Sequence, residues 1–405
     1  MRNALILKVI LIFISAVSVA LPVQAQTKKQ IKELGEKIET SPIFSKFYSG
    51  FALYDPAVST FLYEYQADKY FTPASNTKIF TLYTSLMVLG DSIPTLLYQE
   101  TDSSLVFWGT GDPSFLNPLL PKDNSVLTFL QQSQKNLFFS DHNFKEQAFG
   151  EGWAWDDFNY TYQLERSPMP MFGHIASFRH QKNDLGFQAM PRLMADFVTL
   201  HPGLSSKTVQ FRRTNINNNA IECNNAALAG VPYYEELPIH YDAHLWTRLL
   251  ADTLGKIVQK MQNNIPLADV KALYGDIPAE LTYQLMMQES DNFVAEQLLL
   301  VCANQLFGTQ NTASAIQYAL DSLLNGLPDK PIWVDGSGLS RYNLFTPRTL
   351  VKLLEKVQQR LPNERLFNIF QQVVFQELLK NGMLPKEDNP LMCSQKQERL
   401  VTNIV

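Results

Sequence analysis

The hexapeptide PASNTK at residues 73–78 decides the fold, because a helical pattern of apolar residues begins there and ends at Gly90. If Ser75 opens this helix, Lys78 lies one turn further on and both side chains share a face. A serine hydroxyl is a poor nucleophile until a base removes its proton, and a lysine amine can serve when burial lowers its pKa. The helix N-terminus adds N–H groups where an oxyanion would develop. Alone, S-x-x-K is a common pattern that more often marks a serine N-cap beside a solvated lysine.

A second short motif, Ser290-Asp291-Asn292, follows about two hundred residues downstream. It lies between two helical stretches, where such a sequence ordinarily forms only a cap and a turn. The two motifs together carry more weight than either one. S-x-x-K followed by S-D-N belongs to the signature of serine β-lactamases and penicillin-binding proteins, whose third element is K-T-G.

Further stretches in a fixed order support this interpretation: GTGDP at 109–113, GWAWDD at 152–157, SDNFVAE at 290–296 and DGSGLSR at 335–341. With them, the chain from about residue 47 to 370 resembles the low-molecular-mass penicillin-binding proteins of the D-Ala-D-Ala carboxypeptidase/endopeptidase branch (DacB-like), which carry a large inserted domain. The distance between the two motifs agrees with that branch, because it is far too long for a compact β-lactamase.

The resemblance implies an α/β fold: a serine β-lactamase/transpeptidase-like domain, with an antiparallel sheet and helices, interrupted by a mostly β insertion. It also implies the site. Ser75 would be the acylated nucleophile and Lys78 its general base, while Ser290 would relay a proton to the leaving group and Asn292 would bind the substrate's peptide amide. The partners implied are peptidoglycan stem peptides ending in D-Ala-D-Ala, with β-lactams as covalent inhibitors. No metal or organic cofactor is expected.

Apolar periodicity gives the same organisation along the chain. We expect a helix over 27–45, two strands within 47–65 joined at Asp55-Pro56, and short strands over about 100–240. Further helices are expected at 243–261, 278–289, 292–306, 312–324 and 347–360. The domains predicted are therefore a catalytic domain formed by 26–98 and 270–405, and inserted domain(s) at 99–269.

The amino-terminal stretch 1–25 has the features of a cleaved secretory signal peptide. Arg2 and Lys8 precede a short apolar run that breaks at Pro22 and is followed by small residues. This run is too short to span a membrane comfortably, and no later segment is longer. We therefore expect a periplasmic or secreted protein with no membrane span in the mature chain.

Composition narrows the alternatives. A net charge of −5 excludes polyanion binding as the main purpose, so no nucleic-acid partner is expected. The three cysteines have no zinc-ligand spacing. His240 and His244 have the i, i+4 spacing of a helical metal clasp, but no carboxylate at a third-ligand spacing supports a metal site.

One element of the family pattern is missing, because neither K-T-G, K-S-G nor H-T-G occurs in the sequence. Back-translation of residues 371–405 with free codon choice offers an explanation. In the frame shifted by two positions, it permits AGGFSGTIKKWY from the codons of residues 371–383 and FAKTGTL from those of 393–400. Restoring one C after the codon of Phe370 would give FPAGG and recover the frame. We therefore predict that 371–405 is out of frame, so that the catalytic domain is incomplete and the chain as written is poorly stable and weakly active or inactive.

Three functions compete. The first is a penicillin-binding D-Ala-D-Ala hydrolase. The second is a non-catalytic relic that binds muropeptides or a partner through the inserted domain. The third is an esterase of the same serine–lysine fold, which would turn over esters without releasing D-Ala.

Overall fold

The computed structural model describes residues 28–370 except 182, 183, 185, 202, 204–207, 229, 230, 266 and 268. The predicted signal at 1–25 and the predicted frame change after Phe370 concern stretches outside the described residues. The chain divides into two compact units. Within the described residues, unit 1 contains 28–71 and 346–355, and unit 2 contains 72–345 and 356–370.

Unit 1 is built on an antiparallel pair of strands, β1 (Phe51–Asp55) and β2 (Thr60–Tyr65). Residues 28–39 and α2 (Pro42–Lys46) are helical and precede the pair. The Tyr54 hydroxyl in β1 donates a hydrogen bond to Glu355 Oε1 (2.7 Å) and accepts one from Lys352 Nζ (2.7 Å), which ties β1 to the first part of α9 (Pro347–Arg360).

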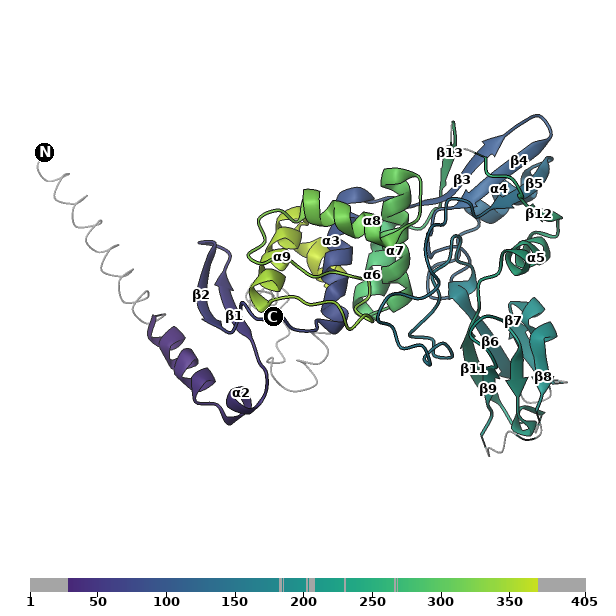
Figure 1. Cartoon of the computed structure of the whole chain (residues 1–405). Coiled ribbons are helices and arrows are strands. Elements are labelled where there is room, and N and C mark those ends of the chain that lie inside the picture. The colour runs from purple at the N-terminus through teal and green to yellow at the C-terminus, as the bar shows by residue number, and fades with distance from the viewer. Residues whose placement is uncertain are drawn as a thin grey trace, which may run out of the picture. The chain divides into compact units, whose positions relative to one another are not determined.

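The helices of unit 2 surround α3, which is buried along most of its length. Figure 1 shows α3 beside α6 and α7, and these three helices are in contact. The helical elements are η1 (Ala74–Thr77), α3 (Lys78–Val88), α6 (Ala279–Gln288), α7 (Asn292–Phe307), α8 (Thr312–Tyr318) and the π-helical turn η5 (Ala319–Leu323).

The remainder of unit 2 holds three sheets. The largest is five-stranded, in the order β12 (Val258–Lys260), β5 (Asn136–Ser140), β4 (Ser104–Gly109), β3 (Pro94–Glu100), β13 (Lys271–Tyr274). A second contains β11 (Tyr233–Pro238), β6 (Ile175–His180) and β7 (Gln188–Met190), and a third β8 (Val198–Leu200), β10 (Ile221–Cys223) and β9 (Phe211–Arg213). Helices α4 (Ser125–Gln132) and α5 (Ala243–Leu254) and the short turns η2 (Phe172–His174), η3 (Arg192–Phe197) and η4 (Asn225–Leu228) connect them. Trp246 and Phe107 are among the fully buried side chains of their common core.

The predicted insertion boundaries fall at this five-stranded sheet. Position 98 lies inside β3, position 269 lies just before β13, and β3 and β13 pair as antiparallel neighbours. The predicted start and end of the insertion therefore lie on neighbouring strands, as expected for a segment that leaves a domain and returns to it at the same place. The boundaries themselves stay a prediction.

The predicted fold class, mixed α/β with antiparallel strands and helices, is confirmed, and α9 has the bounds that the apolar pattern predicts. Helix α7 runs one residue further than predicted, and two other helices differ more from their predicted bounds. The first is split at residues 40–41, because Ser41 caps a new helix that starts with Pro42. Helix α5 stops at Leu254, because Gly255 adopts the left-handed conformation (φ 66°) that terminates helices. Among the described residues, no helix combines the length and apolar character that crossing a bilayer requires.

Candidate active site

Ser75 and Lys78 meet where the 3₁₀ turn η1 leads into α3. Ser75 lies inside η1 and not at the opening of the α-helix, contrary to our expectation, and Lys78 is the first residue of α3. The three-residue spacing still places both side chains on one face, and Lys78 Nζ lies 3.2 Å from Ser75 Oγ. Ser75 is exposed to solvent, whereas Lys78 is only 1% exposed. The arrangement therefore presents the hydroxyl to an incoming molecule and keeps the amine covered.

The Ser290-Asp291-Asn292 motif forms the tight junction between α6 and α7. Asp291 caps α7 by accepting a hydrogen bond from the Val294 N–H (2.9 Å), so Asn292 is the first helical residue. Ser290 Oγ lies 2.9 Å from Ser75 Oγ, and Asn292 Oδ1 accepts a hydrogen bond from Lys78 Nζ at 2.6 Å. All four side chains singled out by the sequence therefore lie within one hydrogen-bonded cluster.

A buried turn from the DGSGLSR segment completes the surroundings of Lys78. The Ser337 carbonyl accepts a hydrogen bond from Lys78 Nζ at 2.9 Å, so the lysine has three acceptors and its three ammonium protons are all used. Gly338 packs against the residue before Ser75: with φ at 90°, a Cβ added there would lie 1.8 Å from the Ala74 carbonyl oxygen. The turn therefore fixes both the Lys78 amine and the backbone next to Ser75.

The protonation of Lys78 follows from its burial. Removal from water disfavours the charged amine and lowers the pKa of Lys78 to about 8, although the nearby carboxylates of Glu296, Asp291 and Asp335 act in the opposite direction. About a tenth of the amine is then neutral at pH 7. Such an amine can accept the Ser75 proton, whereas an exposed lysine would remain almost wholly charged.

Asn292 retains capacity for a substrate. Its Nδ2 donates one hydrogen bond to the Tyr162 carbonyl oxygen at 2.8 Å, and a side-chain amide carries two such protons. Among the described residues the second proton has no hydrogen-bond acceptor. Tyr162 itself is 47% exposed, so the site is open on this side.

Two partners of the cluster were not singled out as site residues from the sequence: the backbone carbonyls of Ser337 and Tyr162. Backbone acceptors leave no residue-type signal, but both residues lie in or close to the stretches GWAWDD and DGSGLSR that carry the family resemblance. The hydrogen bond from Lys78 Nζ to the Ser337 carbonyl places residues 336–338 beside the site.

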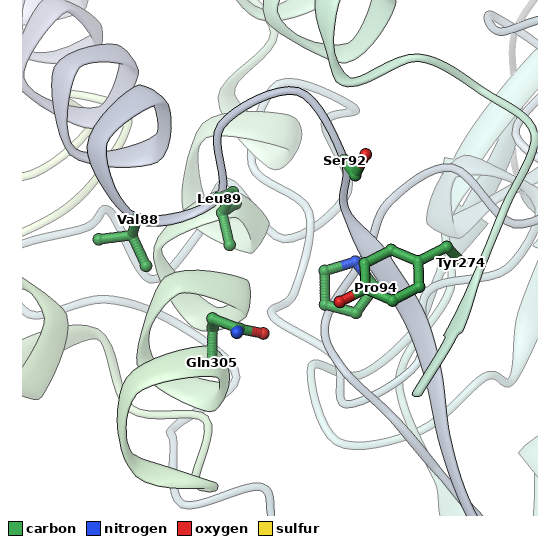
Figure 2. Close-up of a pocket in the computed structure, with 6 residues that line it drawn as sticks. All are labelled: Val88, Leu89, Ser92, Pro94, Tyr274 and Gln305. Carbon is green, nitrogen blue, oxygen red and sulfur yellow. The ribbon is translucent and has the colours of Figure 1, made fainter. Parts of the chain in front are cut away.

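Other candidate features lie elsewhere. A cavity of about 350 Å³ at the C-terminal end of α3 is lined by Val88, Leu89, Ser92, Pro94, Tyr274 and Gln305 (Figure 2). Ser75 precedes the opposite, N-terminal end of that helix. His240 precedes α5 and binds Glu165 through Nδ1 (2.9 Å), so His240 and His244 do not form a pair on one helix. Within the described ranges, no group of three His, Cys, Asp or Glu side chains could hold a metal ion.

The site combines an exposed hydroxyl, a buried amine, a second hydroxyl and an amide, the groups that the S-x-x-K and S-D-N motifs are expected to bring together. The sequence pattern of the D-Ala-D-Ala carboxypeptidase 3 (S13) family matches residues 30–230 and 248–371. The chain therefore belongs to this family, which confirms the resemblance to the DacB-like low-molecular-mass penicillin-binding proteins.

Similar proteins agree with the assignment. The chain is 24% identical over 350 residues to the penicillin-sensitive carboxypeptidase A of Dictyostelium discoideum, and the match covers 71% of this chain but only 64% of that protein's length. The fold is shared with crystal structures of penicillin binding protein 4 (dacB) from Haemophilus influenzae. One is 18% identical with a TM-score of 0.57 and covers 83% of this chain and 79% of that one. The other, complexed with a β-lactam, is 17% identical with the same TM-score and covers 84% and 80%.

Proposed function

We propose that this protein is a serine-type D-Ala-D-Ala carboxypeptidase/endopeptidase that acts on peptidoglycan stem peptides through an acyl-enzyme. The observation that carries the proposal is the cluster of Ser75, Lys78, Ser290 and Asn292, in which Lys78 Nζ and Ser290 Oγ both lie within hydrogen-bond distance of Ser75 Oγ. Membership of the S13 family supports the substrate class.

The contacts suggest a sequence of proton movements. Neutral Lys78 accepts the Ser75 proton as the serine oxygen attacks the carbonyl carbon of the penultimate D-Ala. Ser290 donates a proton to the amine of the terminal residue as the C–N bond breaks, and the proton that Lys78 took from Ser75 is returned to Ser290, which leaves the acyl-enzyme with a neutral lysine. Asn292 holds the stem peptide with its free amide proton. Water then hydrolyses the ester and returns Ser75. A β-lactam would acylate Ser75 by opening its ring amide in the first step.

A fluorescent penicillin tests the proposal directly. In a chain whose frame is restored after Phe370, labelling should be lost in Ser75→Ala, and mass spectrometry of the labelled chain should locate the adduct on Ser75. Release of D-Ala from a stem pentapeptide should depend on the same residue. Ester turnover without D-Ala release would favour an esterase instead.

The missing K-T-G element favours one alternative, a non-catalytic relic that binds muropeptides or a partner. We propose that the loss arises from the frame change after Phe370, and that the chain as written is consequently weakly active or inactive. The end of the family match at residue 371 supports this position for the change. Should neither the written chain nor a frame-restored one bind penicillin at Ser75, the relic becomes the better interpretation.

The proposed substrate also determines the compartment. An enzyme that acts on peptidoglycan must be exported, so we propose a periplasmic or secreted protein from which residues 1–25 are removed. N-terminal sequencing of the protein recovered from the cell envelope or medium checks this. A start near residue 26 is expected, and an intact Met1 would contradict it.

A further inference from the structure

The carboxylate of Glu296 lies between the candidate base and the segment that precedes η2. Glu296 follows Asn292 by one turn of α7 and is 1% exposed. Its Oε1 accepts a hydrogen bond from the Ser337 N–H (2.8 Å), and the carbonyl of the same Ser337 accepts one from Lys78 Nζ (2.9 Å). One residue, Ser337, therefore links Glu296 to the hydrogen bond that positions Lys78.

A buried arginine holds the other oxygen of this carboxylate. Arg166 is 4% exposed and donates to Glu296 Oε2 from both Nε (3.0 Å) and Nη2 (2.7 Å). Glu146 approaches the same guanidinium from another side, at 3.5 Å from Nη1. A buried carboxylate without such a partner would carry a large desolvation cost. Burial raises the pKa of Glu296, and the Arg166 guanidinium acts against this rise, so Arg166 favours the charged carboxylate.

The charges around Lys78 come from several elements. Glu296 belongs to α7, Asp291 caps that helix, and Asp335 begins the buried turn that contains Ser337. All three are acidic. The Arg166 guanidinium contacts these three acidic residues through its ion pair with Glu296.

We propose that Glu296 and Arg166 are positioning residues for Lys78: Glu296 fixes the Ser337 peptide that holds the lysine amine, and Arg166 offsets the charge of Glu296. This inference rests on the proposed function, because it concerns the base of that reaction. It extends the site to two residues that lie 130 positions apart and that do not touch the nucleophile.

The test measures the protonation of Lys78 directly, without an acylation reaction. In the full chain labelled with ¹³C at lysine Cε, the Lys78 resonance is identified by its loss in Lys78→Arg and is followed by NMR across the alkaline pH range. In Glu296→Gln, which removes a nearby negative charge, the titration should move to lower pH by about half a unit or more. In Arg166→Met, which leaves Glu296 uncompensated, it should move to higher pH.

Two further variants separate positioning from general support of the fold. Arg166→Lys retains the positive charge and should restore the parental titration, which also covers the case in which Arg166→Met fails to fold. Glu146→Gln alters the same guanidinium without contact to Ser337 and should leave the titration unchanged. Shifts in the same direction for Glu296→Gln and Arg166→Met, or no shift in Glu296→Gln, would overturn the proposal. Because this readout needs no acylation, its failure is distinct from a failure of penicillin to label Ser75.

Discussion

Ser290 Oγ and Ser75 Oγ lie 2.9 Å apart although 215 positions of chain separate the two residues. Ser290 also has a positive φ of 55°, a left-handed conformation that is uncommon for residues other than glycine. Such a conformation costs on the order of 1 kcal/mol or more and persists only where the surrounding structure enforces it. Here Ser290 is followed directly by the Asp291 cap and the start of α7, and this conformation directs the Ser290 hydroxyl to Ser75 Oγ.

The first prediction concerns this hydroxyl. If Ser290 carries a proton to the leaving group, Ser290→Ala should lower the rate of penicillin acylation by about 10² or more, the usual contribution of a positioned proton donor. Stopped-time labelling with fluorescent penicillin measures the rate. Ser337→Ala is the matched control, because Lys78 uses the Ser337 carbonyl and not its hydroxyl. An acylation rate in Ser290→Ala equal to that of the control would exclude the relay.

The second prediction is a pH dependence of acylation. Only neutral Lys78 can accept the Ser75 proton, and burial lowers its pKa to about 8. The acylation rate constant should therefore rise about tenfold per pH unit below pH 8 and level off above it. In Lys78→Arg the side chain stays charged, so raising the pH should not recover activity. A rate that is flat between pH 6 and 9 in the parent chain would argue against Lys78 as the base.

Local patterns predicted much of this structure because they depend on neighbouring residues. The apolar period that predicts α9 is a property of fourteen consecutive residues, and its bounds agree with the structure. Helix ends were less predictable, since a single backbone conformation at Gly255 stops α5 where apolar residues would have allowed more turns. The roles of the four site residues stay predictions, although the structure brings their side chains together as the motifs implied.

The contacts that support the site had no comparable signal. Arg166 and Glu296 are 130 positions apart, and nothing in the sequence around either one indicates a partner. Arg166 is also an unusual residue to bury, so composition would have placed it at the surface. Only the three-dimensional arrangement of α7 against the segment before η2 pairs these two charges.

The third prediction tests the turn beside the nucleophile. Gly338→Ala should destabilise the protein by about 3 kcal/mol. The new Cβ would collide with the Ala74 carbonyl oxygen, and the φ of 90° is unfavourable for alanine. Gly90→Ala is the control: φ is 65° there but nothing lies within 4 Å, so the conformational cost of about 1 kcal/mol should be all that appears. Urea unfolding compares the two. Equal losses would show that the turn is free to move away from Ala74.

The fourth prediction concerns stability in acid. His174 is fully buried, with its ring centroid 5.1 Å from that of Trp246 and 5.3 Å from that of Phe293. Burial lowers the pKa of His174 to about 4, although Glu165 acts against this. The unfolded chain takes up a proton near pH 6.5 and the folded one only near pH 4. Stability should therefore fall as the pH drops through this window, by at most about 3 kcal/mol from this residue.

His174→Asn provides the comparison. His174 has a positive φ of 63°, which asparagine tolerates well. The variant should be less stable at pH 7, because the smaller side chain leaves space beside Trp246. It should nevertheless lose less stability than the parent between pH 6.5 and 4. Urea unfolding at several pH values gives both slopes, and parallel slopes would mean that another group dominates the acid response.

The fifth prediction addresses the reading frame after Phe370. Without the K-T-G strand, the parent chain lacks one donor of the expected oxyanion hole, and the loss of a single donor costs about 10²–10³ in rate. Insertion of one C after the Phe370 codon should open a frame that encodes AGGFSGTIKKWY and later FAKTGTL. Penicillin labelling at Ser75 should then rise by at least that factor, and thermal unfolding should move to higher temperature, because a sheet edge left open would now be paired.

The control is insertion of a full codon at the same position, which changes the length but not the frame. It should leave labelling as weak as in the parent. Efficient labelling of the parent chain itself would contradict the predicted impairment. A gene sequence in which no single-base change across codons 369–372 opens a K-T-G frame would dismiss the frame change. The weak site would then be a property of this protein's own sequence, and the non-catalytic alternative would gain support.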